Sequence, residues 1–223
     1  MCSPPRNFFV EEGYAVVTPN YRLAPTYPHP TPLNDIFCAY AWTLTHADDY
    51  GFDLTRLVLI GESAGGNAAA MLASVDAPQT YLTDCAYAIP PDIKPQAAVL
   101  YYTPLELSTC VCRTAKQFAA LYLGLEGYEP SEEEAMRKRA VDASPLPWLD
   151  GNEPPFLLFH GTEDTLIPIS ESELFVESVQ AAGGQADLIV VPEAEHGFFA
   201  RPAYPYVRDS WQTVIEFLYS LGS

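Results

Sequence analysis

Residues 57–66 read Leu-Val-Leu-Ile-Gly-Glu-Ser-Ala-Gly-Gly, and the fold prediction rests on this stretch. Four apolar residues, typical of a short buried strand, run into a turn in which Ser63 is flanked by Gly61 and Gly65. An alanine-rich segment follows to about residue 74 and favours a helix. A strand that reverses sharply into a helix crowds the serine's neighbours, so both must be small. The pattern predicts an exposed Ser63 hydroxyl at the edge of a sheet; a glycine-rich turn without function is the alternative.

Strand and helix patterns alternate on both sides of this stretch. We predict buried strands at residues 14–18, 97–102, 156–159 and 187–191, and helices at residues 33–50, 114–123, 132–140, 171–182 and 206–221. Ser131 with Glu134, and Ser170 with Glu173, have the spacing of capping boxes. The alternation predicts a mostly parallel α/β sheet with helices on both faces. We expect residues 1–223 to form a single domain, with an insertion at about residues 103–153 over the edge where ligands bind.

Composition narrows the possible classes of protein. Of the 223 residues, 48% are hydrophobic and 18% are charged, which excludes a disordered chain. Lys and Arg number 11 against 29 Asp and Glu, a net charge of −18 that disfavours nucleic acid and anionic membranes as partners. No apolar run approaches the roughly 18 residues of a membrane span.

The cysteines and the first residues bear on the compartment. Five cysteines is an odd number, and none forms a C-x-x-C pair, so we expect reduced thiols rather than a disulfide framework or a zinc site. No metal ligands are predicted. The first residues contain no apolar segment of the signal-peptide type, which favours a soluble, cytoplasmic protein.

A serine nucleophile needs a base, and the base needs a carboxylate that orients it. His196 follows the last predicted strand by five residues, on the same sheet edge as Ser63. Residues 163 and 164 supply two acids after the strand at 156–159, and Asp164 is preferred because Glu163 lies closer to the strand. The N–H of Ala64, at the helix N-terminus, points where an oxyanion would form.

The remaining histidines have a simpler interpretation. His29 lies in a proline-rich loop, and His46 lies on the surface side of a helix. His160 ends a buried strand, where we expect local hydrogen bonds. Five aromatic residues in the insertion or directly before it either line a substrate pocket or pack in the core; they are Tyr101, Tyr102, Phe118, Tyr122 and Trp148.

These motifs resemble the carboxylesterase type of α/β-hydrolase, closest to the bacterial feruloyl/acetyl-esterase-like group and its hormone-sensitive-lipase-like relatives. The matching segments are residues 13–17, 20–25, 61–66, 144–145, 160–168 and 192–198. The chain order Ser, Asp, His is the order of that fold. The resemblance implies that Ser63 is the nucleophile, Asp164 the orienting acid and His196 the general base. It also implies ester hydrolysis without a cofactor, and a role for residues 21–25 in shaping the floor near the site.

The resemblance further implies a segment of about 70–80 residues upstream, so we expect an N-terminally truncated domain. That segment would supply a second oxyanion donor and a strand between residues 14–18 and 57–60. We therefore predict a serine hydrolase that cleaves carboxylic esters, short-chain acyl or aryl, with a small-molecule ester as its partner. The alternatives are a prolyl-oligopeptidase-like peptidase, against which Ala64 and residues 21–25 argue, and an inactive hydrolase that acts at most as a binding module.

Overall fold

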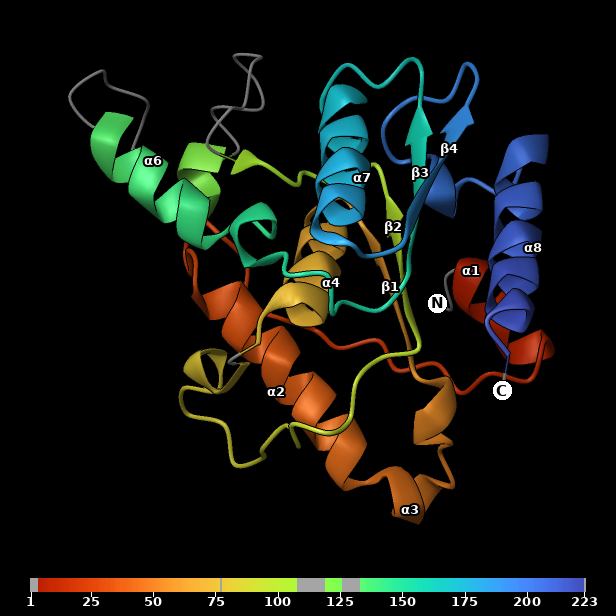
Figure 1. Ribbon diagram of the computed structural model, residues 1–223, viewed down its shortest axis with the longest axis horizontal. Coiled ribbons are helices and arrows are strands. Elements are labelled where there is room, and N and C mark those ends of the chain that lie inside the picture. Colours follow the sequence, from red (N-terminus) through yellow and green to blue (C-terminus); the bar gives the residue numbers. More distant parts are fainter. Residues whose placement is uncertain (1–3, 77, 108–118, 126–132, 223) are drawn as a thin grey trace.

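The computed structural model describes residues 4–76, 78–107, 119–125 and 133–222, and in them a parallel sheet is surrounded by helices (Figure 1). The strands pair side by side in chain order, and they are β1 (Val58–Glu62), β2 (Ala97–Tyr101), β3 (Phe156–Gly161) and β4 (Ala186–Val191). The α-helices are α1 (Pro4–Glu11), α2 (Thr31–Thr45), α3 (Ala47–Tyr50), α4 (Ala64–Ser74), α6 (Glu133–Asp142), α7 (Ser170–Ala182) and α8 (Pro205–Ser220). Short 3₁₀ helices are η1 (Leu54–Arg56), η2 (Pro78–Tyr81), η5 (Leu146–Trp148) and η6 (Phe198–Ala200).

Helices cover both faces of the sheet, as the alternating pattern predicts. Strand β2 is buried along its whole length, and its successive side chains point to opposite faces. Val99 and Tyr101 pack in a core with residues of α8, whereas Ala98 and Leu100 pack with residues of α4 and α7. Strand β3 is buried throughout in the same way. A continuous apolar run is thus explained by two covered faces.

A third core lies between α2 and α4. Leu33, Phe37 and Leu44 of α2 are buried against Ala68 and Met71 of α4. The helix predicted at residues 33–50 is divided in the structure into α2 and α3, which are joined at His46. Gly51 ends α3 in the left-handed conformation (φ 69°), the role that its position predicts.

The strand predicted at residues 14–18 is wrong. This segment has no regular structure, and Val17 is 41% exposed. A strand exists only by pairing with another strand, and within the described residues β1 pairs on one side alone, with β2. Residues 14–18 and β1 instead both line one hollow of about 960 Å³.

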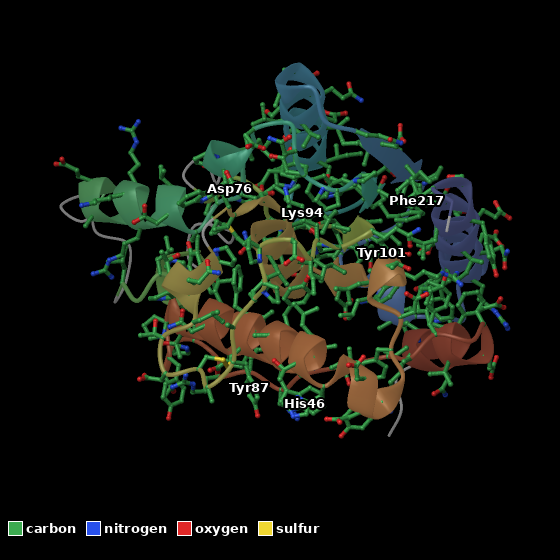
Figure 2. The ribbon with its side chains drawn as sticks, turned by 60° about the horizontal axis from the view of Figure 1, so that its bottom comes forward. His46, Asp76, Tyr87, Lys94, Tyr101 and Phe217 are labelled. Carbon is green, nitrogen blue, oxygen red and sulfur yellow. A yellow bond between two sulfur atoms is a disulfide. The ribbon has the colours of Figure 1, made fainter. Side chains whose placement is uncertain are left out.

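The expectation of reduced cysteines is also wrong for two of the five. Cys38 of α2 and Cys85 form a disulfide (Figure 2), which joins the helix to the segment before β2. In the same region the ring of His46 lies 5.5 Å from that of Tyr87, both labelled in Figure 2. The two cysteines are 47 positions apart, so spacing alone gave no sign of the pair. Cys2, Cys110 and Cys112 lie outside the described residues.

Predictions within and after the insertion have mixed outcomes. Most of the helix predicted at residues 114–123 and the first capping box's Ser131 lie outside the described residues, and residues 119–122 are helical. The second capping box is wrong, because α7 begins earlier: the N–H of Glu173 donates to the carbonyl of Ile169, and Ser170 lies inside the helix. Gly183 ends α7 with φ 96°, as predicted.

Candidate active site

All four strands end at one edge of the sheet, and the candidate residues follow three of these ends. Ser63 comes directly after β1, Asp164 three residues after β3, and His196 five residues after β4. Because the strands are parallel and neighbouring, residues distant in the chain meet at this edge. The structure brings the three predicted residues together there.

Ser63 occupies a strained turn between β1 and α4. Its φ is 50°, in the left-handed region that non-glycine residues adopt at a cost of about 1–3 kcal/mol. Two backbone hydrogen bonds hold the turn: the Ser63 N–H donates to the Tyr101 carbonyl at 3.0 Å, and its carbonyl accepts from the Asn67 N–H at 3.1 Å. The turn presents the hydroxyl at the sheet edge, half-buried.

The two glycines near Ser63 differ in the space that the structure leaves for a side chain. A Cβ at Gly61 would lie 2.3 Å from the carbonyl oxygen of Gly65 and 2.6 Å from the nitrogen of Gly66. A Cβ at Gly65 would meet nothing within 4 Å. The prediction that crowding requires both residues to be small is therefore correct for Gly61 and wrong for Gly65.

The three side chains form a continuous hydrogen-bonded chain. His196 Nε2 lies 2.9 Å from Ser63 Oγ, and His196 Nδ1 lies 2.8 Å from Asp164 Oδ2. A carboxylate only accepts, so the Nδ1 proton is assigned to the bond with Asp164. Nε2 is then free to accept the serine proton. This is the geometry that activates a serine hydroxyl.

Asp164 is held ionised by its surroundings. Its side chain has no exposed surface, and such burial alone would raise the pKa of the carboxyl. Hydrogen bonds from His160, His196 and the Ile167 N–H outweigh that effect and hold the pKa of Asp164 well below its usual range. Oδ1 accepts from the N–H groups of Leu166 and Ile167, both at 2.9 Å, which leaves Oδ2 for His196.

His160 makes the local hydrogen bonds that were predicted, and it also touches the candidate acid. Nε2 donates to the Ile167 carbonyl at 2.9 Å, so Nδ1 accepts from the Ser172 hydroxyl at 2.8 Å. Nε2 also lies 3.5 Å from Asp164 Oδ2. Glu163, the alternative acid, is exposed. The sequence did not indicate this second histidine beside the carboxylate.

The hollow beside Ser63 is the space open to a ligand. Its lining includes Ser63, Ala64, Tyr21 and Phe199, and it is the same hollow that residues 14–18 border. Tyr21 belongs to the segment that the resemblance places near the floor of the site, and burial raises the pKa of its hydroxyl. Ala64 is the first residue of α4, where the backbone N–H has no partner within the helix.

The other aromatic residues divide between core and surface. Tyr101 and Tyr102 are buried, and Trp148 is 37% exposed. Tyr122 packs beside His29, with ring centroids 5.8 Å apart, and Phe118 lies outside the described residues. Burial lowers the pKa of His29 to about 4, so this histidine is neutral at pH 7.

The described part of the chain offers neither a metal site nor a membrane-spanning helix. No group of three His, Cys, Asp or Glu side chains there is placed to hold a metal ion. No helix among those residues has the length and apolarity needed to cross a bilayer.

Known proteins similar to this chain are esterases. The Mycobacterium tuberculosis protein named "Probable carboxylic ester hydrolase LipM" is 26% identical over 196 residues, which are 87% of this chain and 44% of LipM. An ethyl acetate hydrolase of Pseudomonas putida is 27% identical, over 86% of this chain and 58% of its own. This chain thus spans less than two thirds of these relatives.

The fold agrees with a solved esterase structure. Est2, a thermophilic esterase of Thermogutta terrifontis, matches with a TM-score of 0.70 and 27% identity, over 91% of this chain and 69% of its own. Residues 145–221 match the dienelactone hydrolase family. Residues 2–179 match the BD-FAE family, and this match covers well over half of the chain. The chain therefore belongs to the BD-FAE family and has the α/β-hydrolase fold.

Proposed function

We propose that the protein is a serine esterase that hydrolyses small carboxylic esters through an acyl-enzyme. The observation that carries the proposal is the hydrogen-bonded chain from Ser63 through His196 to Asp164. Similarity to LipM, ethyl acetate hydrolase and Est2 supports the same reaction class. The relatives named here include no peptidase, so they lend the prolyl-oligopeptidase-like alternative no support.

Each residue has a defined part in the proposed reaction. Ser63 Oγ attacks the ester carbonyl carbon while its proton passes to His196 Nε2. Asp164 stabilises the imidazolium that forms, and the Ala64 N–H donates to the carbonyl oxygen as it becomes negative. The C–O bond to the alcohol then breaks, and the alcohol leaves with the proton from Nε2. Water, deprotonated by the same nitrogen, cleaves the acyl-enzyme and restores Ser63.

We further propose that the domain's insertion at residues 103–153 covers this edge of the sheet and forms part of the substrate pocket. Contacts at its two ends support this placement. The Asn67 side chain, on α4, donates to the carbonyls of Pro104 and Ala143, both at 3.1 Å. The Leu107 N–H donates to Ser144 Oγ at 3.0 Å. Both ends of the insertion are thereby tied to α4, the helix that directly follows Ser63.

The charge and the disulfide bear on substrate and compartment. A net charge of −18 repels anionic esters, so we propose neutral esters as substrates. The Cys38–Cys85 disulfide favours an oxidising compartment over the cytoplasm that the first residues suggested.

The test compares Ser63→Ala with Ser74→Ala, using p-nitrophenyl acetate and a fluorophosphonate that labels activated serines. Ser74 lies at the other end of α4, and its buried hydroxyl has no hydrogen-bond partner among the described residues, so its loss should change little. We expect Ser63→Ala to lose about 10³-fold or more in turnover, together with labelling. Wild-type turnover by Ser63→Ala would refute the assignment. Cleavage of a proline anilide peptide in preference to the ester would support the peptidase, and ligand binding without turnover or labelling would support the binding module.

A further inference from the structure

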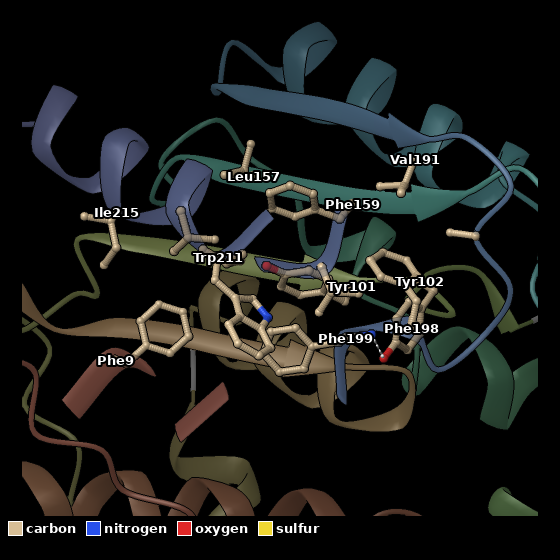
Figure 3. Close-up of a cluster of buried hydrophobic side chains, with 14 of the residues drawn as sticks. Phe9, Tyr101, Tyr102, Leu157, Phe159, Val191, Phe198, Phe199, Trp211 and Ile215 are labelled. Carbon is tan, nitrogen blue, oxygen red and sulfur yellow. Dashed lines mark hydrogen bonds between the residues drawn. The ribbon is translucent and has the colours of Figure 1, made fainter. Parts of the chain in front are cut away.

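The Tyr102 side chain connects the turn that carries Ser63 to the loop that carries His196. Its hydroxyl donates to Oε2 of Glu62, the residue before Ser63. The same hydroxyl accepts from the N–H of Phe199, at 3.2 Å, three residues after His196 (Figure 3). Burial and the Glu62 carboxylate raise the pKa of Tyr102, so the hydroxyl keeps its proton and donates it. One buried group thus links two segments that are distant in the chain.

The Tyr102 ring also lies against the imidazole. Its centroid is 4.7 Å from that of His196, with 59° between the planes, and 4.9 Å from that of Phe198. Only 1% of Tyr102 is exposed, so the ring forms a fixed wall. A ring held in this way limits how far the His196 side chain can turn from Ser63.

The backbone at Tyr102 is unusual for a large residue. Its φ is 39°, in the left-handed region, as is that of Ser63 at the end of the neighbouring strand. The Tyr102 N–H donates to the Phe159 carbonyl at 2.8 Å, and the Ser63 N–H donates to the Tyr101 carbonyl. Strained residues of this kind persist where the surroundings determine them, and they gather at functional sites.

We propose that Tyr102 is a positioning residue that holds Ser63 and His196 at hydrogen-bonding distance for the reaction. This inference rests on the proposed esterase function and deepens it. Tyr102 acts through its neighbours: the hydroxyl fixes Glu62 and the loop at Phe199, and the ring fixes the imidazole. The competing explanation is that Tyr102 only packs in the core. In that case its substitution would lower stability without lowering kcat.

Tyr101 provides the matched control. It precedes Tyr102, has no exposed surface, and its hydroxyl donates to Ser210 Oγ at 3.3 Å in the core on the face of α8. Tyr101→Phe and Tyr102→Phe therefore each remove one buried hydroxyl from the same short stretch; the first removes one hydrogen bond and the second removes two. Only the second change breaks the link between the two catalytic segments.

We expect Tyr102→Phe to lower kcat by about tenfold with KM unchanged, and to slow fluorophosphonate labelling of Ser63 by the same factor. We expect Tyr101→Phe to keep both rates while also lowering the melting temperature, because it too loses a buried hydrogen bond. A purely structural hydroxyl would not separate kcat from KM in this way. Wild-type kcat in Tyr102→Phe, or an equal loss in Tyr101→Phe, would overturn the positioning role.

Variants of Glu62 test the other half of the link. Glu62→Gln keeps an oxygen that accepts from Tyr102 and should retain activity, whereas Glu62→Ala should reproduce the loss in kcat. The combination of Tyr102→Phe with Glu62→Ala should be no slower than Tyr102→Phe alone, because both changes break one interaction. Losses that multiply would contradict the link. If the wild-type protein is neither labelled nor active, both the proposed function and the positioning role are wrong. If the wild type and Tyr102→Phe are both labelled at the normal rate, only the positioning role is wrong.

Discussion

Asp164 shows how neighbouring atoms set the ionisation state of one residue of the candidate site. A carboxyl without exposed surface would ordinarily take up a proton more readily. Here the donors are supplied by the residues that follow it, Leu166 and Ile167, and by two histidines on either side. The short loop after β3 therefore both places the acid and keeps it charged, which is the condition for orienting His196.

This arrangement predicts how stability depends on pH. The pKa of Asp164 is lower in the folded chain than the roughly 3.9 of an unfolded aspartate, so the folded state binds the proton less readily. The stabilisation is present above pH of about 4 and is lost as the pH falls toward the folded pKa. Between about pH 6 and 8, we expect the unfolding free energy of the wild type to exceed that of Asp164→Asn by a constant amount. As the pH falls well below 4, we expect this excess to shrink by more than about 1 kcal/mol.

Urea unfolding at several pH values measures this difference, because titrating groups that do not contact Asp164 are common to both proteins and their contributions cancel. An excess that stays constant through the whole acidic range would show that the pKa of Asp164 is not lowered by folding.

The turn between β1 and α4 depends on one glycine more than on the other. A methyl group at Gly61 would meet the backbone of residues 65 and 66, which cannot move without shifting the start of α4. A methyl group at Gly65 meets open space, and alanine is a better helix former than glycine. We expect Gly61→Ala to lower the unfolding free energy by about 2 kcal/mol or more, and Gly65→Ala to leave it unchanged or raise it by up to about 1 kcal/mol.

Chemical denaturation of the two variants beside the wild type is sufficient for this test. Equal destabilisation by both changes would mean that crowding at the turn is symmetric, contrary to the geometry.

Elements that are determined locally could be predicted from the sequence, and those that depend on a distant partner could not. Strands β2 and β3 are continuous apolar runs, and their burial on both faces follows from that pattern alone. Residues 14–18 have an equally apolar pattern, yet within the described residues they pair with no strand and line the hollow instead. The Ser170–Glu173 spacing failed for a related reason: the chain was already helical one residue before the expected cap.

The same distinction applies to the site. Ser63, Asp164 and His196 could be placed because each follows a recognisable strand, and parallel strands bring such loops to one edge. Tyr102 could not be told from a core aromatic such as Tyr101, because its role depends on contacts with Glu62 and Phe199 that no local pattern records. His160 was assigned local bonds correctly, but its approach to Asp164 required the structure.

The molecule as a whole combines high net charge with a disulfide between two distant parts of the chain. A charge of −18 on 223 residues opposes compaction through self-repulsion. The Cys38–Cys85 disulfide ties α2 to the segment before β2, and residues of this segment, such as Tyr81 and Ile89, pack in the same core as α2. Closing a loop of 47 positions restricts the unfolded chain, which offsets part of that repulsion.

We therefore expect removal of this disulfide to lower stability without changing the chemistry. Replacing Cys38 and Cys85 together by serine should reduce the unfolding free energy by about 2–4 kcal/mol, and dithiothreitol should do the same to the wild type. Labelling of Ser63 should keep its wild-type rate in the double variant under folding conditions, because neither cysteine contacts the side chains of Ser63, Asp164 or His196. Urea unfolding with and without reductant measures the first effect, and fluorophosphonate labelling the second.

The double variant is also the control for the reductant. If the Cys38–Cys85 bond is the one that dithiothreitol acts on, the double variant should unfold at the same urea concentration in oxidising and reducing buffer. A further loss of stability on reduction would place a second disulfide among Cys2, Cys110 and Cys112. A wild type that is indifferent to reductant, with a double variant as stable as the wild type, would mean that the bond does not constrain the unfolded chain. Packing in the core between α2 and α4, without the disulfide, would then be sufficient to hold the segment before β2 against α2.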